Sequence, residues 1–406
     1  MRNPILTQIG GKYERNPSKV ILGTAAEALV TEAFRGLDGF YDYHMHLLGL
    51  GKNRPETWVN PSVFSLTHPM DWIKAKIFLN ASGVRTKKNA DEQYLDQLIK
   101  FIQDIPFPGK YCLFAWDKCY DLDGEVSYPD TKVYISNEYV YRVCMQMPGK
   151  LIPVVSIHPY RADALQELDK WAKLGVKMIK WIPATMGMDP SHPRCAPFYQ
   201  RIRELDMVLL SHAGKEENIP VRRFQELNNP LLFRLPLEIG VKLVLAHCAG
   251  KGKGKDLDDK GKPVDNYKLF YRLMDEPRYE HHLYGDVSAM VQVNRCGEPL
   301  QTTFDKKEHH HRLLYGSDYP LPAINSLISL NLLQKLKYLD RGEVKPLREI
   351  YRKNPLLFSF VLYRRLRDPK MNSYRFPDTM FASHPALEIK ALTSSELAQN
   401  PVKSVP

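Results

Sequence analysis

Two histidines and an aspartate lie at alternate positions in an otherwise apolar and aromatic stretch, FYDYHMHLLGL (40–50). Because successive side chains of a β-strand point to opposite faces, Asp42, His44 and His46 share one face. Burying a polar group without a hydrogen bond or an ion costs about 2–7 kcal/mol. Imidazole nitrogens and carboxylate oxygens are ligands of zinc, manganese and iron. The alternation therefore favours a metal site on a buried strand.

Further residues that could take part in catalysis or binding lie near the ends of other short apolar segments. These segments are rich in Val, Ile and Leu and cover residues 110–117, 151–160, 176–183, 207–214, 241–250, 283–290 and 312–320. The residues of interest near their carboxyl ends are Trp116, Asp117, His158, Lys180, His212, His247, Asp286 and Asp318. From His158 onward, roughly 20 to 40 residues separate one polar end from the next, which leaves room for a crossover helix between parallel strands.

The repeated strand and helix pattern predicts an α/β fold, a distorted (β/α)8 TIM barrel. Segments with helical spacing of apolar residues lie at 24–37, 90–105, 162–175 and 196–206. Near-continuous apolar strands indicate a parallel sheet covered on both faces, and eight units favour a closed barrel over an open sheet. In a barrel, the polar residues at the strand ends meet at one mouth.

The predicted barrel domain covers residues 39–366. Residues 1–38 form an N-terminal extension that packs on the barrel, and residues 367–406 form a C-terminal tail without a sustained period. We expect the tail to pack along the barrel or onto a neighbouring subunit and to end in a disordered segment.

Composition narrows the class of protein. The net charge of +11 is spread over the chain and no nucleic-acid-binding motif is present, so the basic charge better fits an anionic small molecule. The six cysteines lack CxxC spacing, which predicts reduced thiols. There is neither an apolar leader segment nor a stretch of about 18 apolar residues. We therefore expect a soluble, cytoplasmic protein that binds neither nucleic acid nor membrane.

Five motifs together resemble the amidohydrolase superfamily of metal-dependent hydrolases. They are DYHMH (42–46), KMIKW (177–181), SHAG (211–214), AHCAG (246–250) and GSDYP (316–320). The similarity is greatest to the amidohydrolase-related branch, which also holds aminocarboxymuconate-semialdehyde decarboxylase. It covers residues 39–358, and REIYRKNPLLF (348–358) resembles the helix that closes such domains.

The resemblance implies roles for six of these residues. It makes His44, His46 and His212 metal ligands, and Asp318 a ligand and proton acceptor. His247 would orient or deprotonate the water, or bind a second metal. Lys180 would either be carboxylated and bridge two metals or act as a plain cation that grips a substrate carboxylate. We expect one divalent ion rather than two, zinc in the first place, with manganese and iron as alternatives.

Four further residues are candidates for substrate binding: His158, Arg194, Trp116 and Asp286. Each has a structural alternative, such as a cap beside Pro159 for His158 or a partner of loop amides for Asp286. The glycine- and lysine-rich stretch at 250–262 lacks the spacing of a phosphate-binding loop, and we expect a mobile, solvated loop there. The run His309–His311 precedes the last strand, and we expect it on the surface at the opposite rim.

The predicted function is metal-dependent hydrolysis of a small carbonyl, ester, amide or lactone substrate by metal-bound water, with Asp318 and His247 handling protons. Nonoxidative decarboxylation of an unsaturated or aromatic acid by the same site is the first alternative. A barrel that has lost catalysis and acts as a binding protein is the second. The partner is a small molecule, anionic in the simplest interpretation of the charge, and the family resemblance favours a homodimer.

Overall fold

A parallel barrel forms the centre of the molecule in the computed structural model, which describes residues 10–51, 55–65, 69–221 and 223–393. Within these ranges eight strands pair in parallel in the order β1-β3-β5-β6-β7-β8-β11-β12. Their bounds are β1 (Phe40–His46), β3 (Gly109–Phe114), β5 (Leu151–Val155), β6 (Met178–Trp181), β7 (Val208–Ser211), β8 (Lys242–Leu245), β11 (Leu283–Asp286) and β12 (Leu313–Leu314).

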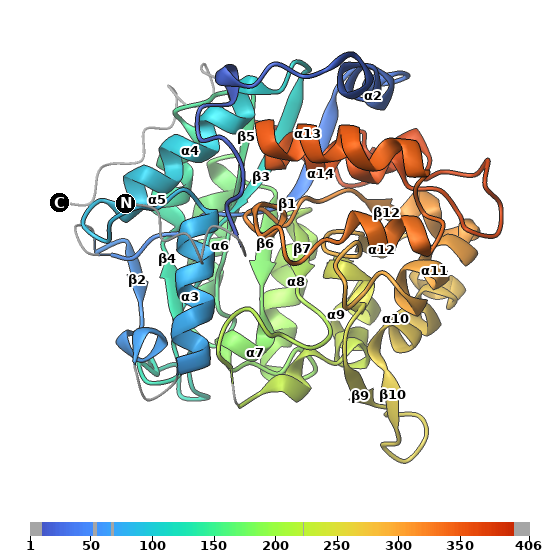
Figure 1. Cartoon of the computed structure of the whole chain (residues 1–406). Helices are drawn as coiled ribbons and strands as arrows, with labels where there is room; N and C mark the ends of the chain where they lie inside the picture. The colour runs from blue at the N-terminus through green and yellow to red at the C-terminus, as the bar shows by residue number, and fades with distance from the viewer. Residues whose placement is uncertain (1–9, 52–54, 66–68, 222, 394–406) are drawn as a thin grey trace.

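The barrel closes between its first and last strands. The amide of Tyr43 donates to Tyr315 O at 3.0 Å, and the amide of His46 donates to Tyr319 O at 3.0 Å. Helices surround the strands on the outside (Figure 1). The predicted α/β TIM barrel is therefore confirmed, and each strand falls in the segment expected for it except that β3 begins one residue earlier, at Gly109.

The helices fill the connections between strands. They are α2 (Thr24–Phe34), α3 (Pro69–Ala81), α4 (Ala90–Asp104), α5 (Asn137–Cys144), α6 (Ala164–Lys173), α7 (Pro183–Met186), α8 (Ala196–Glu204), α9 (Arg234–Ile239), α10 (Asn266–Met274), α11 (Glu298–Asp305), α12 (Leu330–Lys335), α13 (Val344–Lys353) and α14 (Pro355–Arg365). The four helical segments expected from the sequence contain α2, α4, α6 and α8. In α4, for example, Tyr94, Leu98 and Phe101 recur at helical spacing and are buried against the barrel.

The segment between β1 and β3 is more structured than the sequence indicates. It contains β2 (Thr57–Val59), which pairs antiparallel with β4 (Val133–Ile135), and then the helix α3. Figure 1 draws β2, β4 and α3 on one side of the molecule, away from α2 and α13. These elements form one wall of the pocket described below.

Both ends of the described chain pack on the barrel. At the N-terminal side, the ring of Phe34 in α2 stacks on Phe360 of α14, with centroids 4.7 Å apart. At the C-terminal side, Leu387 and Ile389 are fully buried among inner barrel residues such as Met178 and Val208, which begin their strands. We therefore propose a barrel domain at 39–366 with these flanking segments as extensions. The expected disordered end falls at residues 394–406, outside the described residues.

Three expectations about local structure are wrong. REIYRKNPLLF does not form one helix, because Asn354 ends α13 and its side chain accepts the amides of Leu356 and Leu357 to begin α14. His309 and His310 are buried rather than on the surface; the ring of His309 bonds Asp275 at 2.7 Å.

The third concerns the stretch at 250–262, which is largely exposed to solvent as expected but is not a continuous loop. Part of it forms an antiparallel hairpin of β9 (Lys253–Lys255) with β10 (Pro263–Asp265), which projects from the body of the molecule in Figure 1. Arg272 of α10 forms an ion pair with Asp256 at 2.6 Å, which ties the turn to that helix. Among the described residues, no helix has the length and apolar composition needed to cross a membrane.

Candidate metal centre

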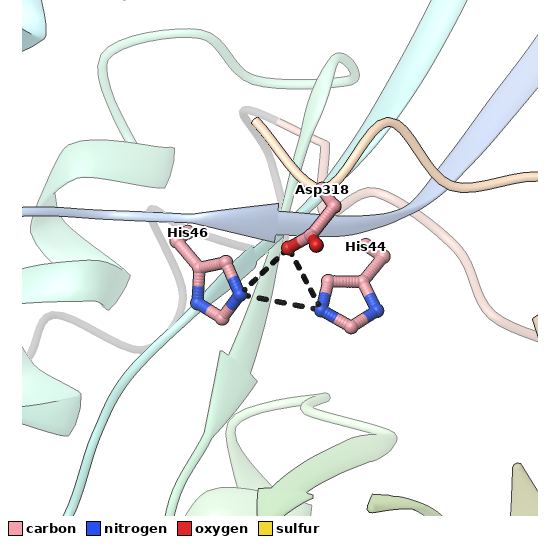
Figure 2. Close-up of side chains that lie close together, drawn as sticks. All are labelled: His44, His46 and Asp318. Carbon is pink, nitrogen blue, oxygen red and sulfur yellow. Dashed lines mark hydrogen bonds and ion pairs between the residues drawn. The ribbon is translucent and has the colours of Figure 1, made fainter. Parts of the chain in front are cut away.

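Two histidines of β1 and an aspartate that follows β12 bring three potential ligand atoms together. His44 Nε2 and His46 Nε2 are 3.2 Å apart. Asp318 Oδ1 is 3.1 Å from His46 Nε2 and 3.5 Å from His44 Nε2. In Figure 2 the two rings turn their edges toward each other below the carboxylate of Asp318. Residues far apart in the sequence thus converge at the carboxyl ends of the strands, as expected for a barrel.

The backbone fixes Asp318 in this position. Its amide donates to His44 O at 2.8 Å, which couples the end of the last strand directly to β1. Asp318 has a φ of 57°, and His247 a φ of 58°, both in the left-handed region. A residue other than glycine held there costs about 1–3 kcal/mol. The surrounding contacts therefore maintain two strained residues at this site. Burial raises the pKa of the Asp318 carboxyl above its ordinary value.

Asp286, at the end of β11, orients two histidines from behind. Its Oδ2 accepts the Nδ1 proton of His44 at 2.9 Å, and its Oδ1 accepts the amides of His247 at 3.1 Å and Ser288 at 2.9 Å. Because a carboxylate can only accept, His44 carries its proton on Nδ1 and presents the Nε2 lone pair to the pocket. This carboxylate–histidine pair is the arrangement that orients a metal-ligating imidazole.

His247 presents a lone pair to the same space. Its Nδ1 lies 3.0 Å from the carbonyl oxygen of Ser288, which can only accept, so Nδ1 carries the proton. Its Nε2 is 3.9 Å from Asp318 Oδ2. Burial holds the pKa values of His44, His212 and His247 well below the ordinary histidine value, so the neutral rings are favoured. The Nε2 lone pair of His247 can therefore accept a hydrogen bond next to Asp318.

Lys180 at the end of β6 lies against these histidines. Its Nζ is 3.4 Å from His44 Nε2 and sits over the ring of Phe114. Burial lowers the pKa of Lys180 to about 8, while the nearby carboxylates of Asp286 and Asp318 oppose that shift. The side chain is thus a cation that is easily deprotonated, which is compatible with either of its expected roles.

His212, which follows β7, has a free ring nitrogen. Its Nε2 is buried and makes no hydrogen bond, and the nearest carboxylate oxygen, Glu216 Oε2, is 3.5 Å away. Its ring lies beside His247, with centroids 5.1 Å apart. His212 is not part of the compact group formed by His44, His46 and Asp318, whose ligand atoms all lie within 4.8 Å of one another. It lines the same pocket.

The donor set fits a divalent cation. The Nε2 lone pair of His44 and the acceptor Asp318 Oδ1 lie 3.5 Å apart, and two acceptors at that distance repel unless a cation or proton lies between them. The buried Nε2 of His212 lacks a partner, which a metal would supply. A second group, His44, His247 and Asp286, also lies within 4.8 Å. Its Nδ1 atoms already donate hydrogen bonds within the protein, so it is less suited to an ion.

A pocket extends from these residues to the surface. His46, Lys180, His212, His247 and Asp318 line its inner end. Apolar side chains from the β1–β3 connection and the strand ends line most of the remainder, among them Leu48, Leu50, Val59, Val63, Phe64, Phe78, Leu79, Val84, Trp116, Val133, Ile182, Ile219, Pro220 and Leu321. The pocket therefore suits a substrate with an apolar body.

The four expected substrate-binding residues occupy different places. Trp116 lines the pocket, with its ring 5.8 Å from that of His46. Asp286 lies behind the histidines and does not line the pocket. His158 is also outside it, since its two ring nitrogens bond Met186 O and the amide of Tyr160. Arg194 is exposed and packs near Tyr160, away from the pocket.

Three residues of the site were not found from the sequence. Glu216 lies beside His212, Ser288 bonds His247, and Arg295 is buried close enough to lower the pKa of three site histidines. Glu216 falls four residues after His212, a spacing that could have identified it. The other two have no sequence signal, because they reach the site only through the loop after β11.

A family model described as Amidohydrolase matches residues 41–324. No curated protein matches the chain. An uncharacterized TIM-barrel protein from Bordetella bronchiseptica is 14% identical, with 77% of this chain and 99% of that chain covered and a TM-score of 0.47.

Two further solved structures are similar at the same low level. A protein provisionally described as a 2-pyrone-4,6-dicarboxylic acid hydrolase from Pseudomonas putida is 18% identical over 73% of this chain and 93% of that chain, with a TM-score of 0.41. The 2,6-dihydroxybenzoate decarboxylase from Rhizobium is 11% identical over 70% and 88%, with a TM-score of 0.37. Such values provide no evidence on the reaction catalysed by this chain.

Proposed function

Since this chain belongs to the amidohydrolase family, we propose that it is a metal-dependent hydrolase acting on a small carbonyl, ester, amide or lactone substrate. The observation that carries the proposal is the convergence of His44, His46 and Asp318, whose potential ligand atoms lie close together. The buried, unpartnered Nε2 of His212 in the lining of the same pocket supports it.

We propose that His44, His46, His212 and Asp318 hold one divalent ion, zinc in the first place. When bound, such an ion lowers the pKa of a coordinated water and polarises a carbonyl oxygen. Asp286 keeps His44 in the tautomer whose Nε2 faces the pocket. One ion is favoured because the Nδ1 atoms of the second group are already engaged by Asp286 and Ser288.

Asp318 and His247 are the residues that we assign to proton transfer. Burial raises the pKa of Asp318, so its carboxylate accepts a proton more readily than an exposed one does. His247 Nε2, 3.9 Å from Asp318 Oδ2, can receive that proton or hold the attacking water. Lys180 can stabilise negative charge on the reacting oxygen, and the apolar walls exclude bulk water.

Nonoxidative decarboxylation by the same residues is the second candidate. The apolar lining of the pocket favours it, because a carboxylate removed from water loses charge when it leaves as carbon dioxide. Lys180 would then hold the substrate carboxylate before it leaves. Incubation of aryl acids with the protein distinguishes the two reactions, since decarboxylation releases carbon dioxide and hydrolysis consumes water.

The test is metal content together with activity. We expect the purified protein to contain about one ion per chain, and His44→Ala and His212→Ala to lose most of it while retaining the fold. Asp318→Asn should reduce hydrolysis of a panel of aryl esters and lactones by about 10²–10⁴-fold. His281→Ala, at an exposed histidine, is the matched control. Folded His44→Ala and His212→Ala proteins with undiminished metal would contradict the ligand assignment.

A further inference from the structure

Arg295 is a buried cation without an anionic partner. It lies in the segment between β11 and α11, and it is only 5% exposed. Its Nη1 donates to Gln292 Oε1 at 2.8 Å, whereas its Nε makes no hydrogen bond. None of the carboxylates in the described part of the chain forms an ion pair with it. An unpaired buried charge is costly, so its retention requires an explanation.

The guanidinium lines a second pocket with an excess of positive charge. Lys74, Lys251 and Arg295 contribute to its wall, and Glu217 is the acidic residue there. Glu217 is already bonded by Lys251 and by Lys215, the latter at 3.0 Å. Among the described residues no direct ion pair offsets the charge of Arg295, and Asp318, Glu216 and Glu217 stabilise it only at longer range. Asn218 and Asn294 add further polar groups to the lining.

This second pocket adjoins the one over the metal centre. Lys74, Phe78 and Asn218 line both. A molecule that reaches the inner histidines through the apolar pocket can thus extend a charged group past Phe78 toward Arg295.

We propose that Arg295 is a specificity-determining residue that binds a carboxylate or phosphate group of the substrate, while the apolar body of that substrate fills the pocket beside Phe78. The planar guanidinium suits both anions, since its donors match two oxygens at once. The Nε is buried and makes no hydrogen bond, so one donor of this fork is unsatisfied within the protein. The identity of the bound molecule as a substrate rests on the hydrolase function proposed above; the anion site itself does not.

The experiment compares matched ligands that differ only in charge. We would titrate 1-naphthoate, 1-naphthyl phosphate and the neutral 1-naphthamide into the purified protein and measure affinity by calorimetry. The native protein should bind at least one of the two anions about 10-fold or more tighter than the amide. In Arg295→Met the affinity for that anion should fall by about 10- to 100-fold, and the affinity for the amide should not change. The anion that binds more tightly shows whether the site takes a carboxylate or a phosphate group.

Two variants control the interpretation. Arg341→Met removes an exposed arginine that lines neither pocket, and it should bind as the native protein does. Arg295→Lys should recover part of the anion affinity as a point charge, and it tests the site should Arg295→Met fail to fold. The proposal would be overturned if folded Arg295→Met bound the preferred anion as tightly as the native protein does. It would also be overturned if Arg295→Lys bound both the anion and the amide with the affinities of the native protein.

The outcome is separable from that of the hydrolase proposal. Arg295→Met should retain the metal content of the native protein, because Arg295 is not among the ligands. Loss of anion selectivity with normal metal content and normal hydrolysis of neutral esters supports Arg295 as the anion site. If the protein instead prefers the anion over the amide but does not contain the expected metal ion, the result would count against the hydrolase function and not against the anion site.

Discussion

Asp286 determines which nitrogen of His44 faces the pocket, although it never reaches the pocket itself. Its two oxygens accept from His44 Nδ1 on one side and from the amides of His247 and Ser288 on the other. Asp286→Asn can satisfy only one of these sides. If the amide nitrogen of the substituted side chain faces His44, the proton of His44 moves to Nε2, and Nε2 no longer offers a lone pair to the pocket. If the amide nitrogen instead faces the backbone amides of His247 and Ser288, hydrogen-bond donors face one another without an acceptor.

We therefore expect Asp286→Asn to weaken metal binding by about 10- to 100-fold with the fold retained. Competition with a chromogenic chelator measures the affinity. Asp275→Asn is a suitable control, because Asp275 also bonds a histidine, His309, but outside the pocket. Equal metal affinity in Asp286→Asn and native protein would show that Asp286 does not orient His44.

The sequence was sufficient to bring His44, His46 and Asp318 to the same end of the barrel, and insufficient where the direction of a side chain depends on the path of a loop. His44 and His46 could be placed on one face from alternation alone, and Asp318 from its position after the last strand. His158 also ends a strand, but its ring turns to the backbone of Met186 and Tyr160, which depends on the path of the following loop. Arg295 was not predicted because a buried arginine has no sequence pattern of its own.

At the scale of elements, the strands were predictable and α3 was not. Barrel strands are apolar on both faces and short, a pattern that few other elements share. In α3 only Ala81 is buried, and apolar residues occur around the whole helix rather than along one stripe. One side of α3 lines a pocket, and Ile77, Phe78 and Leu79 are only partly buried against the core. The periodic pattern that identifies an amphipathic helix is therefore missing from α3.

This role of α3 predicts the effect of Phe78→Ala. Phe78 lines both pockets, and removing its ring takes away apolar surface available to a ligand. Burial of such a side chain is worth about 1.5–3 kcal/mol, so we expect 1-naphthamide to bind about 10-fold or more weakly. Ile73→Ala is the matched control, because Ile73 lies on the same helix but lines neither pocket. Similar affinities in the two variants would argue against α3 as a pocket wall.

The whole molecule separates chemistry and packing between the two ends of the barrel. The histidines and Asp318 lie where the strands end, and the described C-terminal segment covers the opposite end. Leu387, Ile389 and Ala391 are buried there, while Glu388 and Lys390 between them are exposed. The alternation places one face of the segment in the barrel core, although Glu388, with a φ of 49°, is not extended. The tail was expected to pack along the barrel, but the insertion of these side chains into its end was not predicted because only three apolar positions carry it.

Ile389→Ala tests whether this segment completes the core. Ile389 is fully buried among inner barrel residues, and such a truncation lowers the free energy of unfolding by about 2–5 kcal/mol. Urea denaturation measures the loss, with Lys390→Ala as the neighbouring exposed control. Because the metal centre lies at the other end, we expect the folded Ile389→Ala protein to retain its metal. An unchanged urea midpoint would mean that the segment rests on the barrel without stabilising it, and parallel loss of metal would mean that the two ends are not independent.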